Sequence, residues 1–317
     1  MKWMLKAAAA GTLAVLGAGA YVFCESCPRK KEDLRPIEER VDPLWEEYQE
    51  TVFEGIHWFE EQEIETVEIQ SHDGLRLRGR YLEHPNAKGT ILLFHGYRTD
   101  GVTDFSGVFS YYYGLGYSIL SVYQRAHVMS EGKYITFGAK ERFDCQRWAW
   151  YAYRRFGKDH PLLLDGMSMG ASTVLMASAL DLPPTVKGII ADCGFTSGWE
   201  ELLHIIRGRK IPCATVIMHA ADLFAKLVAG FSFRECSTTE SLAKTKLPVL
   251  MIHGEADEFV PARFSKEGYA ACGSEKELLL FPGAKHGLSY MVDQPRCQAA
   301  LERFLRMHME GLDETAV

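Results

Sequence analysis

A serine flanked by two glycines is the strongest candidate for chemistry in the 317-residue sequence. Ser168 lies at the centre of Gly166-Met167-Ser168-Met169-Gly170, which matches the pattern G-x-S-x-G. Glycines at the flanking positions leave room for a tight strand-to-helix turn that presents the serine hydroxyl. The apolar run 162–164 precedes the motif, and the helix-forming stretch 171–180 follows it. This setting predicts that Ser168 is a nucleophile.

A serine hydroxyl is a poor nucleophile until a neighbouring base takes its proton. With a nucleophile on such a turn, the expected chain order is serine, then acid, then histidine. Asp257 follows the apolar run 247–252, and His286 follows the run 277–281. Parallel strands end at the same edge of a sheet, so both side chains are expected near Ser168. We therefore predict that His286 is the base and that Asp257 orients it.

Other acids and histidines lie close enough in the sequence to be weighed for these two roles. Glu255 and Glu258 flank Asp257, and either is an alternative acid. His253 precedes the acid loop and is expected to be structural. His127 also lies near a strand end, but it comes too early in the chain order to be the base.

The reaction also needs two backbone N–H groups aimed at the negative charge that develops on the substrate oxygen. One is expected from Met169, the residue after the nucleophile, and the other from the loop that follows the apolar run 89–94. That loop reads His95-Gly96-Tyr97-Arg98, and we predict the N–H of Tyr97 as the second donor. His95 is expected to be structural. Arg98 is expected to form a salt bridge, with contact to an anionic substrate group as the alternative.

Short apolar runs separated by turns and helices must position these residues. The first two runs predict a hairpin, because Asp73-Gly74 between them is a favoured tight turn. Helix-forming stretches at 139–156, 170–180, 262–272 and 296–310 alternate with the later runs. We predict an α/β fold with a mostly parallel eight-stranded sheet flanked by helices, and with strands at 64–70, 75–82, 89–94, 117–122, 161–165, 187–191, 247–252 and 277–281.

Two further segments accompany this domain, which is expected to cover residues 64–317. Residues 198–244 are too long for one crossover helix and contain apolar stretches at 202–206 and 214–228, so we predict an inserted helical cap. Residues 29–63 are rich in glutamate with interleaved aromatic residues. They predict a helical linker that packs on the main domain.

The N-terminal segment, residues 1–28, has the composition of a membrane helix. Residues 7–23 are uncharged, and three basic residues follow at 29–31. We predict a membrane anchor, with the basic residues keeping the catalytic region in the cytoplasm. The alternative is a signal peptide cleaved near Ala18-Gly19-Ala20, which would give a secreted protein. Because every catalytic motif lies beyond residue 90, removal of residues 1–28 is expected to leave turnover of a soluble ester unchanged.

Composition narrows the classes of partner. The net charge is −7 and no basic stripe runs through the catalytic region, so nucleic acid is not an expected partner. Eight cysteines are scattered along the chain, which favours free thiols but leaves disulfides open. The pair Cys24 and Cys27 has C-x-x-C spacing without a second pair, so no metal is expected there. The predicted chemistry requires no cofactor, and the sequence does not indicate the oligomeric state.

Taken together, these motifs resemble the α/β-hydrolase superfamily over about residues 65–312. The stretches 229–233 (AGFSF) and 247–254 (LPVLMIHG) resemble bacterial esterases and serine-aminopeptidase-like hydrolases that often carry an N-terminal membrane helix. The resemblance implies activity, because the triad motifs are intact. It leaves the substrate open, because caps vary widely in such proteins.

We predict a serine hydrolase that cleaves a small carboxylic ester through an acyl-enzyme intermediate. A peptidase acting on short peptides, and a thioesterase or acyltransferase, are the alternatives of the same class. The alternative of another class is a non-catalytic binding protein on a hydrolase fold.

Overall fold

A computed structural model describes residues 2–31 and 43–312 of the chain. Its centre is an eight-stranded sheet with the strand order β1-β2-β4-β3-β5-β6-β7-β8. The first two pairs in this order are antiparallel, and the remaining neighbours are parallel. The strands are β1 (Ile64–Gln70), β2 (Arg76–Leu82), β3 (Thr90–Phe94), β4 (Ser118–Val122), β5 (Leu162–Met167), β6 (Val186–Asp192), β7 (Val249–Gly254) and β8 (Lys276–Phe281). The predicted fold class is confirmed.

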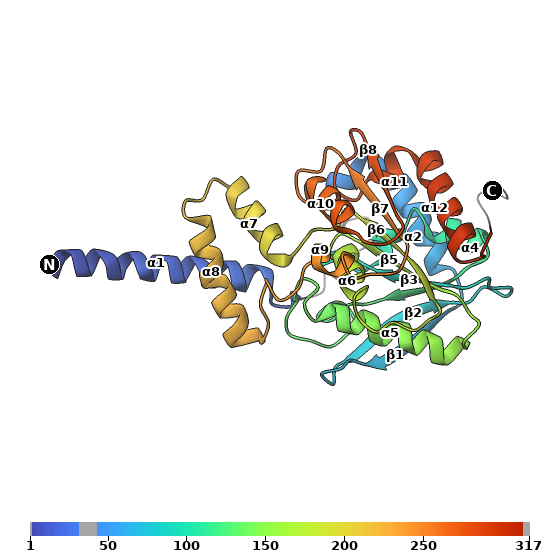
Figure 1. Ribbon diagram of the computed structural model, residues 1–317, viewed down its shortest axis with the longest axis horizontal. Coiled ribbons are helices and arrows are strands. Elements are labelled where there is room, and N and C mark those ends of the chain that lie inside the picture. Colours follow the sequence, from blue (N-terminus) through green and yellow to red (C-terminus); the bar gives the residue numbers. More distant parts are fainter. Residues whose placement is uncertain (1, 32–42, 313–317) are drawn as a thin grey trace.

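Helices cover both faces of this sheet (Figure 1). The apolar core on one face joins the sheet to α2 (Gln49–Glu60), α3 (Val102–Phe105), α4 (Phe109–Gly114), α11 (Ser289–Val292) and α12 (Gln294–His308). The core on the other face includes α5 (Glu141–Phe156), α6 (Met169–Ala177) and α9 (Thr238–Leu242), and α10 (Arg263–Ala271) packs beside α9. Strands such as β3 are buried along their whole length because both faces are covered.

The register of the parallel strands brings their carboxyl ends together. Phe94 of β3 pairs with Gly166 of β5, and Asp192 of β6 pairs with Met167 and Ile252 on its two sides. The loops that follow β3, β5, β6, β7 and β8 therefore leave the sheet at one edge, which is where α/β folds build their sites.

The segment 198–244 is helical, and part of it stands apart from the sheet. It contains α7 (Gly198–Gly208), α8 (Ala214–Phe224), the π-helical turn η3 (Ala225–Ala229) and α9. Helix α7 contacts the loop after β7, where the ring of His204 lies 3.0 Å from the carbonyl of Glu258. Helix α8 instead packs against the N-terminal helix α1 (Lys2–Ser26) and crosses it steeply, as Figure 1 shows.

Helix α1 projects from the body of the molecule (Figure 1). Residues 9–26 of this helix are long and apolar enough to cross a membrane, a test that a signal sequence also passes. After α1 the chain reaches the 3-10 helix η2 (Pro43–Tyr48) and then α2. The predicted linker at 29–63 thus contains η2 and α2, while its residues 32–42 lie outside the described residues.

Candidate active site

Ser168 occupies a sharp turn between β5 and α6. Its backbone has φ 55° and ψ −114°, a conformation that costs a residue with a side chain about 1–3 kcal/mol. A Cβ added to Gly170 would lie 1.7 Å from the carbonyl oxygen of Phe94, and one on Gly166 would lie 2.4 Å from the backbone of Gly170. The two glycines of the motif are therefore required by backbone contacts, and the turn is the elbow that the sequence predicts.

The structure brings the three predicted residues together at the carboxyl edge of the sheet. The Nε2 atom of His286 lies 3.0 Å from the Oγ atom of Ser168. The Nδ1 atom of His286 lies 2.7 Å from the Oδ2 atom of Asp257. Ser168 and Asp257 are buried, and the His286 side chain is 16% exposed. The imidazole thus bridges a hydroxyl and a carboxylate in one continuous hydrogen-bonded chain.

The carboxyl group of Asp257 is held in its ionised form. Burial raises its pKa, but hydrogen bonds from His253 and His286 outweigh burial and lower the pKa to about 2. The backbone N–H groups of Phe259 and Val260 also donate to its Oδ1 atom, at 3.0 and 2.8 Å. A fixed carboxylate of this kind can stabilise a positive charge on the neighbouring imidazole of His286.

The alternative residues lie elsewhere. Glu255 and Glu258 are exposed, and the carboxylate of Glu255 lies 3.8 Å from the ammonium of Lys266. His253 is fully buried, with Nε2 2.7 Å from the carbonyl of Val260 and 3.4 Å from Asp257. It is a second histidine on the acid, a role that its position before the acid loop did not reveal.

His127 supports the loop that carries the predicted oxyanion donor. Its Nε2 atom accepts a hydrogen bond of 3.0 Å from the backbone N–H of Arg98. The carbonyl of Arg125 accepts from the other ring nitrogen of His127 at 2.8 Å. Both ring nitrogens are therefore occupied by the backbone, which leaves no nitrogen to act on a substrate.

The loop after β3 lies directly beside Ser168. A Cβ added to Gly96 would lie 3.5 Å from the Cβ of Ser168. Within the described residues, the N–H groups of Tyr97 and Met169 donate to no backbone acceptor. The N–H of Gly96 donates to Asp104 at 2.6 Å, which holds the start of the loop. The two N–H groups that the sequence predicts as oxyanion donors are therefore unpaired within the described backbone.

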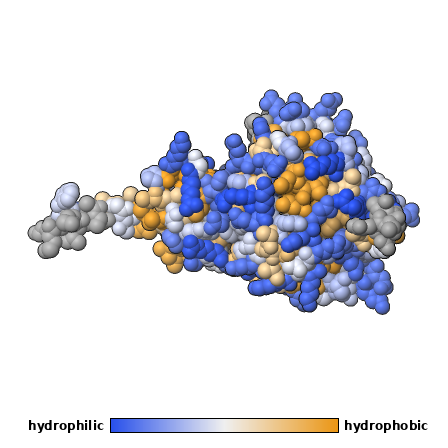
Figure 2. Space-filling view, turned by 45° about the horizontal axis from the view of Figure 1, so that its top comes forward, coloured by the Kyte–Doolittle hydropathy of each residue, from blue (hydrophilic) through white to orange (hydrophobic). Residues whose placement is uncertain are grey.

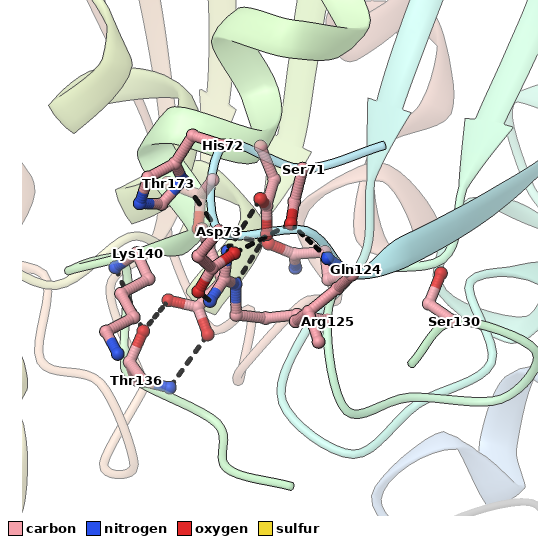
Figure 3. Close-up of polar contacts among 12 residues, drawn as sticks. Ser71, His72, Asp73, Gln124, Arg125, Ser130, Thr136, Lys140 and Thr173 are labelled. Carbon is pink, nitrogen blue, oxygen red and sulfur yellow. Dashed lines mark hydrogen bonds and ion pairs between the residues drawn. The ribbon is translucent and has the colours of Figure 1, made fainter. Parts of the chain in front are cut away.

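A network of buried polar groups joins the loop after β3 to α6. The side chain of Gln124 donates to the carbonyl of His95 at 2.5 Å and accepts from Thr173 of α6 at 3.1 Å. The neighbouring Arg125 guanidinium lies between two carboxylates, Asp73 at 3.0 Å and Asp144 at 2.6 Å. Figure 3 shows Gln124 and Arg125 linking the Ser71–Asp73 turn to Thr173. The hairpin thus fixes the segment that carries Gln124.

Arg98 does not form the expected salt bridge among the described residues. Its guanidinium donates to the carbonyl of Glu25 at the end of α1 and approaches the carbonyl of Pro28 at 3.5 Å. It also stacks on the ring of Tyr97, 4.6 Å from the centroid. The hydroxyl of Tyr97 donates to the carbonyl of Ser26 at 2.8 Å. The N-terminal segment is therefore in contact with the proposed oxyanion loop.

Cys193 is a further neighbour that the sequence did not single out. It follows β6 with φ 49°, and its sulfur lies within 4.8 Å of ligating atoms of Asp257 and His286. Burial raises the pKa of this thiol well above its usual value, and the charges of Asp192 and Asp257 add to that effect. A protonated thiol is a weak metal ligand, so this group does not favour a metal site. A second cluster, His72 with Asp73 and Asp144, already holds the Arg125 cation.

Part of the chain matches a family model, and a longer part resembles a protein of known sequence. The family model described as "Serine hydrolase (FSH1)" matches residues 169–287. The uncharacterized protein YqkD of Bacillus subtilis is 27% identical over 254 residues, which cover 80% of this chain and 82% of YqkD.

Two solved structures from Pyrococcus share the fold. The P. furiosus esterase Pf2001 superposes with a TM-score of 0.66 at 20% identity and covers 90% of this chain and 98% of its own. The P. horikoshii acylaminoacyl peptidase superposes with a TM-score of 0.59 at 17% identity and covers 81% of this chain and 44% of its own. These structures show that the chain has the fold of an α/β hydrolase, and its residues 169–287 match a family model of serine hydrolases.

Proposed function

We propose that the protein hydrolyses carboxylic esters with Ser168 as nucleophile, His286 as base and Asp257 as the orienting acid. One observation carries the proposal: the imidazole of His286 lies within hydrogen-bonding distance of both partners, 3.0 Å from Ser168 and 2.7 Å from Asp257. Removal of the serine proton by this imidazole creates an alkoxide that attacks the ester carbonyl.

The N–H groups of Tyr97 and Met169 would stabilise the oxyanion of the tetrahedral intermediate. Removing one such donor costs a hydrolase about 10²–10³ in kcat. His286 then protonates the leaving alcohol, and the acyl group remains on Ser168. A water molecule, deprotonated by the same imidazole, releases the acid and restores the enzyme. No step of this cycle requires a cofactor.

Labelling with a fluorophosphonate probe tests the nucleophile. We expect the wild type to label, and Ser168→Ala to lose labelling together with several orders of magnitude of turnover, because triad members act as a unit. The matched control is Ser110→Ala on the exposed side of α4, which should label as the wild type. Wild-type turnover in Ser168→Ala would refute the mechanism. Absence of labelling in the wild type would favour a binding protein.

The leaving group is tested with a panel of substrates that share one acyl group. An ester is proposed as the substrate because an alkoxide leaves more readily than an amide nitrogen. The panel contains p-nitrophenyl esters, thioesters and aminoacyl-nitroanilides, and kcat/KM is measured on each. A preference for the nitroanilides would make the protein a peptidase, and a preference for the thioesters would make it a thioesterase.

We also propose that α1 anchors the chain in a membrane, with the catalytic region on the cytoplasmic side. The helix has 25 residues and would extend about 37 Å, which is enough to cross a hydrocarbon core of about 30 Å. Extraction of membranes with alkaline carbonate should leave the full-length chain in the pellet. A chain that is recovered in the supernatant with its N-terminus intact would contradict the anchor.

A further inference from the structure

Large apolar side chains are exposed on one part of the molecule. Thirteen large hydrophobic residues are exposed among those described, and eight of them lie on α1 or within residues 211–228. Val216, Leu223 and Leu227 are 51%, 46% and 74% exposed. Their spacing of seven and four residues places them on a single face of the helix formed by α8 and η3. Concentrated exposure of this kind marks an interaction surface, whereas isolated exposed apolar residues do not.

This apolar face borders α1. A Cβ added to Gly19 of α1 would lie 2.4 Å from the Cβ of Ala220, so the two helices are in close contact at that point. Ala220 lies four residues after Val216 and three before Leu223, and therefore on the same side of α8 as both. Figure 2 shows apolar surface gathered where the projecting helix meets the body of the molecule. The exposed apolar residues of α8 and η3, Val216, Leu223 and Leu227, thus lie beside α1, and we call them the cap face.

If α1 spans a bilayer, the position of the Gly19–Ala220 contact along α1 determines how deep the cap face lies in that bilayer. Gly19 lies seven residues before Ser26, the end of α1, which corresponds to about 10 Å along the helix axis. Amphipathic helices at a membrane surface bury their apolar side about 5–10 Å into the headgroup and acyl boundary. With Ser26 at the aqueous side of a bilayer, α8 would lie at that boundary.

The charge around the cap face fits anionic lipid. Residues 202–234 contain five arginines and lysines and one aspartate, on a chain whose net charge is −7. Arg207, Arg209 and Lys210 are exposed at the end of α7. The aspartate, Asp222, is buried and paired with Lys226 at 2.7 Å. Exposed basic residues are attracted to the negative charge of an anionic membrane surface.

We infer that the cap face lies in the headgroup region of an anionic bilayer beside α1, and that the enzyme takes acyl esters that partition into membranes. The inference rests on the proposed anchorage and on the proposed esterase activity. The apolar cluster that includes Phe23 of α1 continues through α7 and α8 to Met169 beside the nucleophile. The buried core beneath the cap face thus extends to the residue that follows Ser168.

Site-specific fluorescence tests the position of the cap face in the full-length chain. The exposed native thiols are first removed as Cys24→Ser and Cys213→Ser, and the remaining six cysteines are buried. An environment-sensitive fluorophore is then placed at Leu227→Cys on the cap face, at Leu13→Cys on α1, or at Lys158→Cys. Lys158 is exposed just after α5 and serves as the aqueous control. The proteins are reconstituted in vesicles of phosphatidylglycerol and phosphatidylcholine that contain nitroxide-labelled lipid.

We expect quenching at positions 13 and 227 and none at position 158. Quenching at 13 without quenching at 227 overturns the inference and leaves the anchor intact. Loss of quenching at 13 overturns the anchor itself. A blue-shifted emission at 227 that lipid quenchers do not change would instead make the cap face a contact between two copies of the chain, and would also overturn the inference.

Kinetics test the consequence for the substrate. Leu227→Glu should lower kcat/KM at least tenfold on a long-chain ester embedded in the same vesicles, and should leave kcat/KM on soluble p-nitrophenyl butyrate unchanged. The control, Lys158→Glu, should change neither. Equal losses on both substrates, or no loss on either, would refute the inference. A wild type that cleaves no ester would refute the proposed function, while the fluorescence result would still stand.

Discussion

Replacing Glu201 by glutamine should make the protein more stable at neutral and alkaline pH, and the gain should disappear in mild acid. Glu201 lies on α7 and is 3% exposed, and neither of its carboxylate oxygens has a hydrogen-bond partner in the part of the chain that the structure describes. Burial raises its pKa from 4.5 to about 8; the charge of Asp257 adds to this rise and that of Arg263 opposes it. Glu201 is therefore protonated in the folded protein at pH values where it would ionise in the unfolded chain.

The direction and the size of the effect follow from this difference. Below pH 4.5 both states hold the proton, so Glu201 does not affect the pH dependence of folding. Between pH 4.5 and about 8 only the unfolded state releases it, and each pH unit costs the folded state about 1.4 kcal/mol. Between pH 5 and pH 8 the penalty therefore grows by about 3 kcal/mol. For a chain of this length that corresponds to about 6 °C in Tm.

The assay is thermal unfolding of the full-length protein in detergent at pH 5 and pH 8. We expect the Tm difference between Glu201→Gln and wild type to be about 6 °C more positive at pH 8 than at pH 5. Asp165 and Asp192, whose pKa values burial raises to about 7, are present in both proteins and cancel in the comparison. Glu200→Gln, a half-exposed neighbour on α7, is the control and should keep the wild-type difference. A Tm difference for Glu201→Gln that is equal at the two pH values would refute the reasoning.

Three further substitutions test the site and its surroundings. Gly170→Ala places a Cβ 1.7 Å from the Phe94 carbonyl and should abolish folding or esterase activity. The control, Gly114→Ala, places a Cβ with no described atom within 4 Å and should keep both. An active Gly170→Ala variant would contradict the tight turn. Arg98→Ala should lower kcat several-fold with little change in KM, because the proposed oxyanion loop loses its hydrogen bonds to the carbonyls of Glu25 and Pro28. An unchanged kcat on a soluble ester would show that these bonds do not position the loop. Phe224→Ala removes a half-buried ring that packs against the apolar core of α7 and α8. It should change the relative kcat/KM values on acetate, butyrate and octanoate esters by amounts equivalent to ~1–3 kcal/mol. An equal change on all three esters would exclude acyl selection by the cap.

The sheet could be predicted from the sequence because its signals are local. Short apolar runs bounded by turn residues predicted all eight strands, and the strand expected at 277–281 is observed at Lys276–Phe281. The alternation of strands and helices then restricts the connections to a parallel sheet with helices on both faces. The position of α8 could not be predicted in this way. Its apolar stretch was expected to cover the sheet edge or line a pocket, but its partner is α1, some 200 residues earlier in the chain.

The proximity of Ser168, Asp257 and His286 could be predicted because each lies just beyond the end of a parallel strand, where the fold itself determines the position. The positions of the residues around these three are not determined by the ends of the strands. Whether the acid carries one histidine or two depends on the path of the chain after β7, which brings His253 within 3.4 Å of Asp257. Cys193 gave a weak signal, as the residue directly after a central strand, but its positive φ is visible only in three dimensions.

The N-terminal segment shows most clearly where composition fails as a guide. The change from apolar to basic residues near position 28 predicted a boundary between an anchor and an independent enzyme. Contacts cross that boundary: Ser26 accepts a hydrogen bond from Tyr97, and the carbonyl of Cys27 accepts one from Ile135 at 2.7 Å. A chain that begins after residue 28 would lose these acceptors and leave the proposed oxyanion loop without its outer support. Unchanged turnover after such a truncation no longer follows from the distance in sequence, because α1 ends against the loop that would hold the transition state.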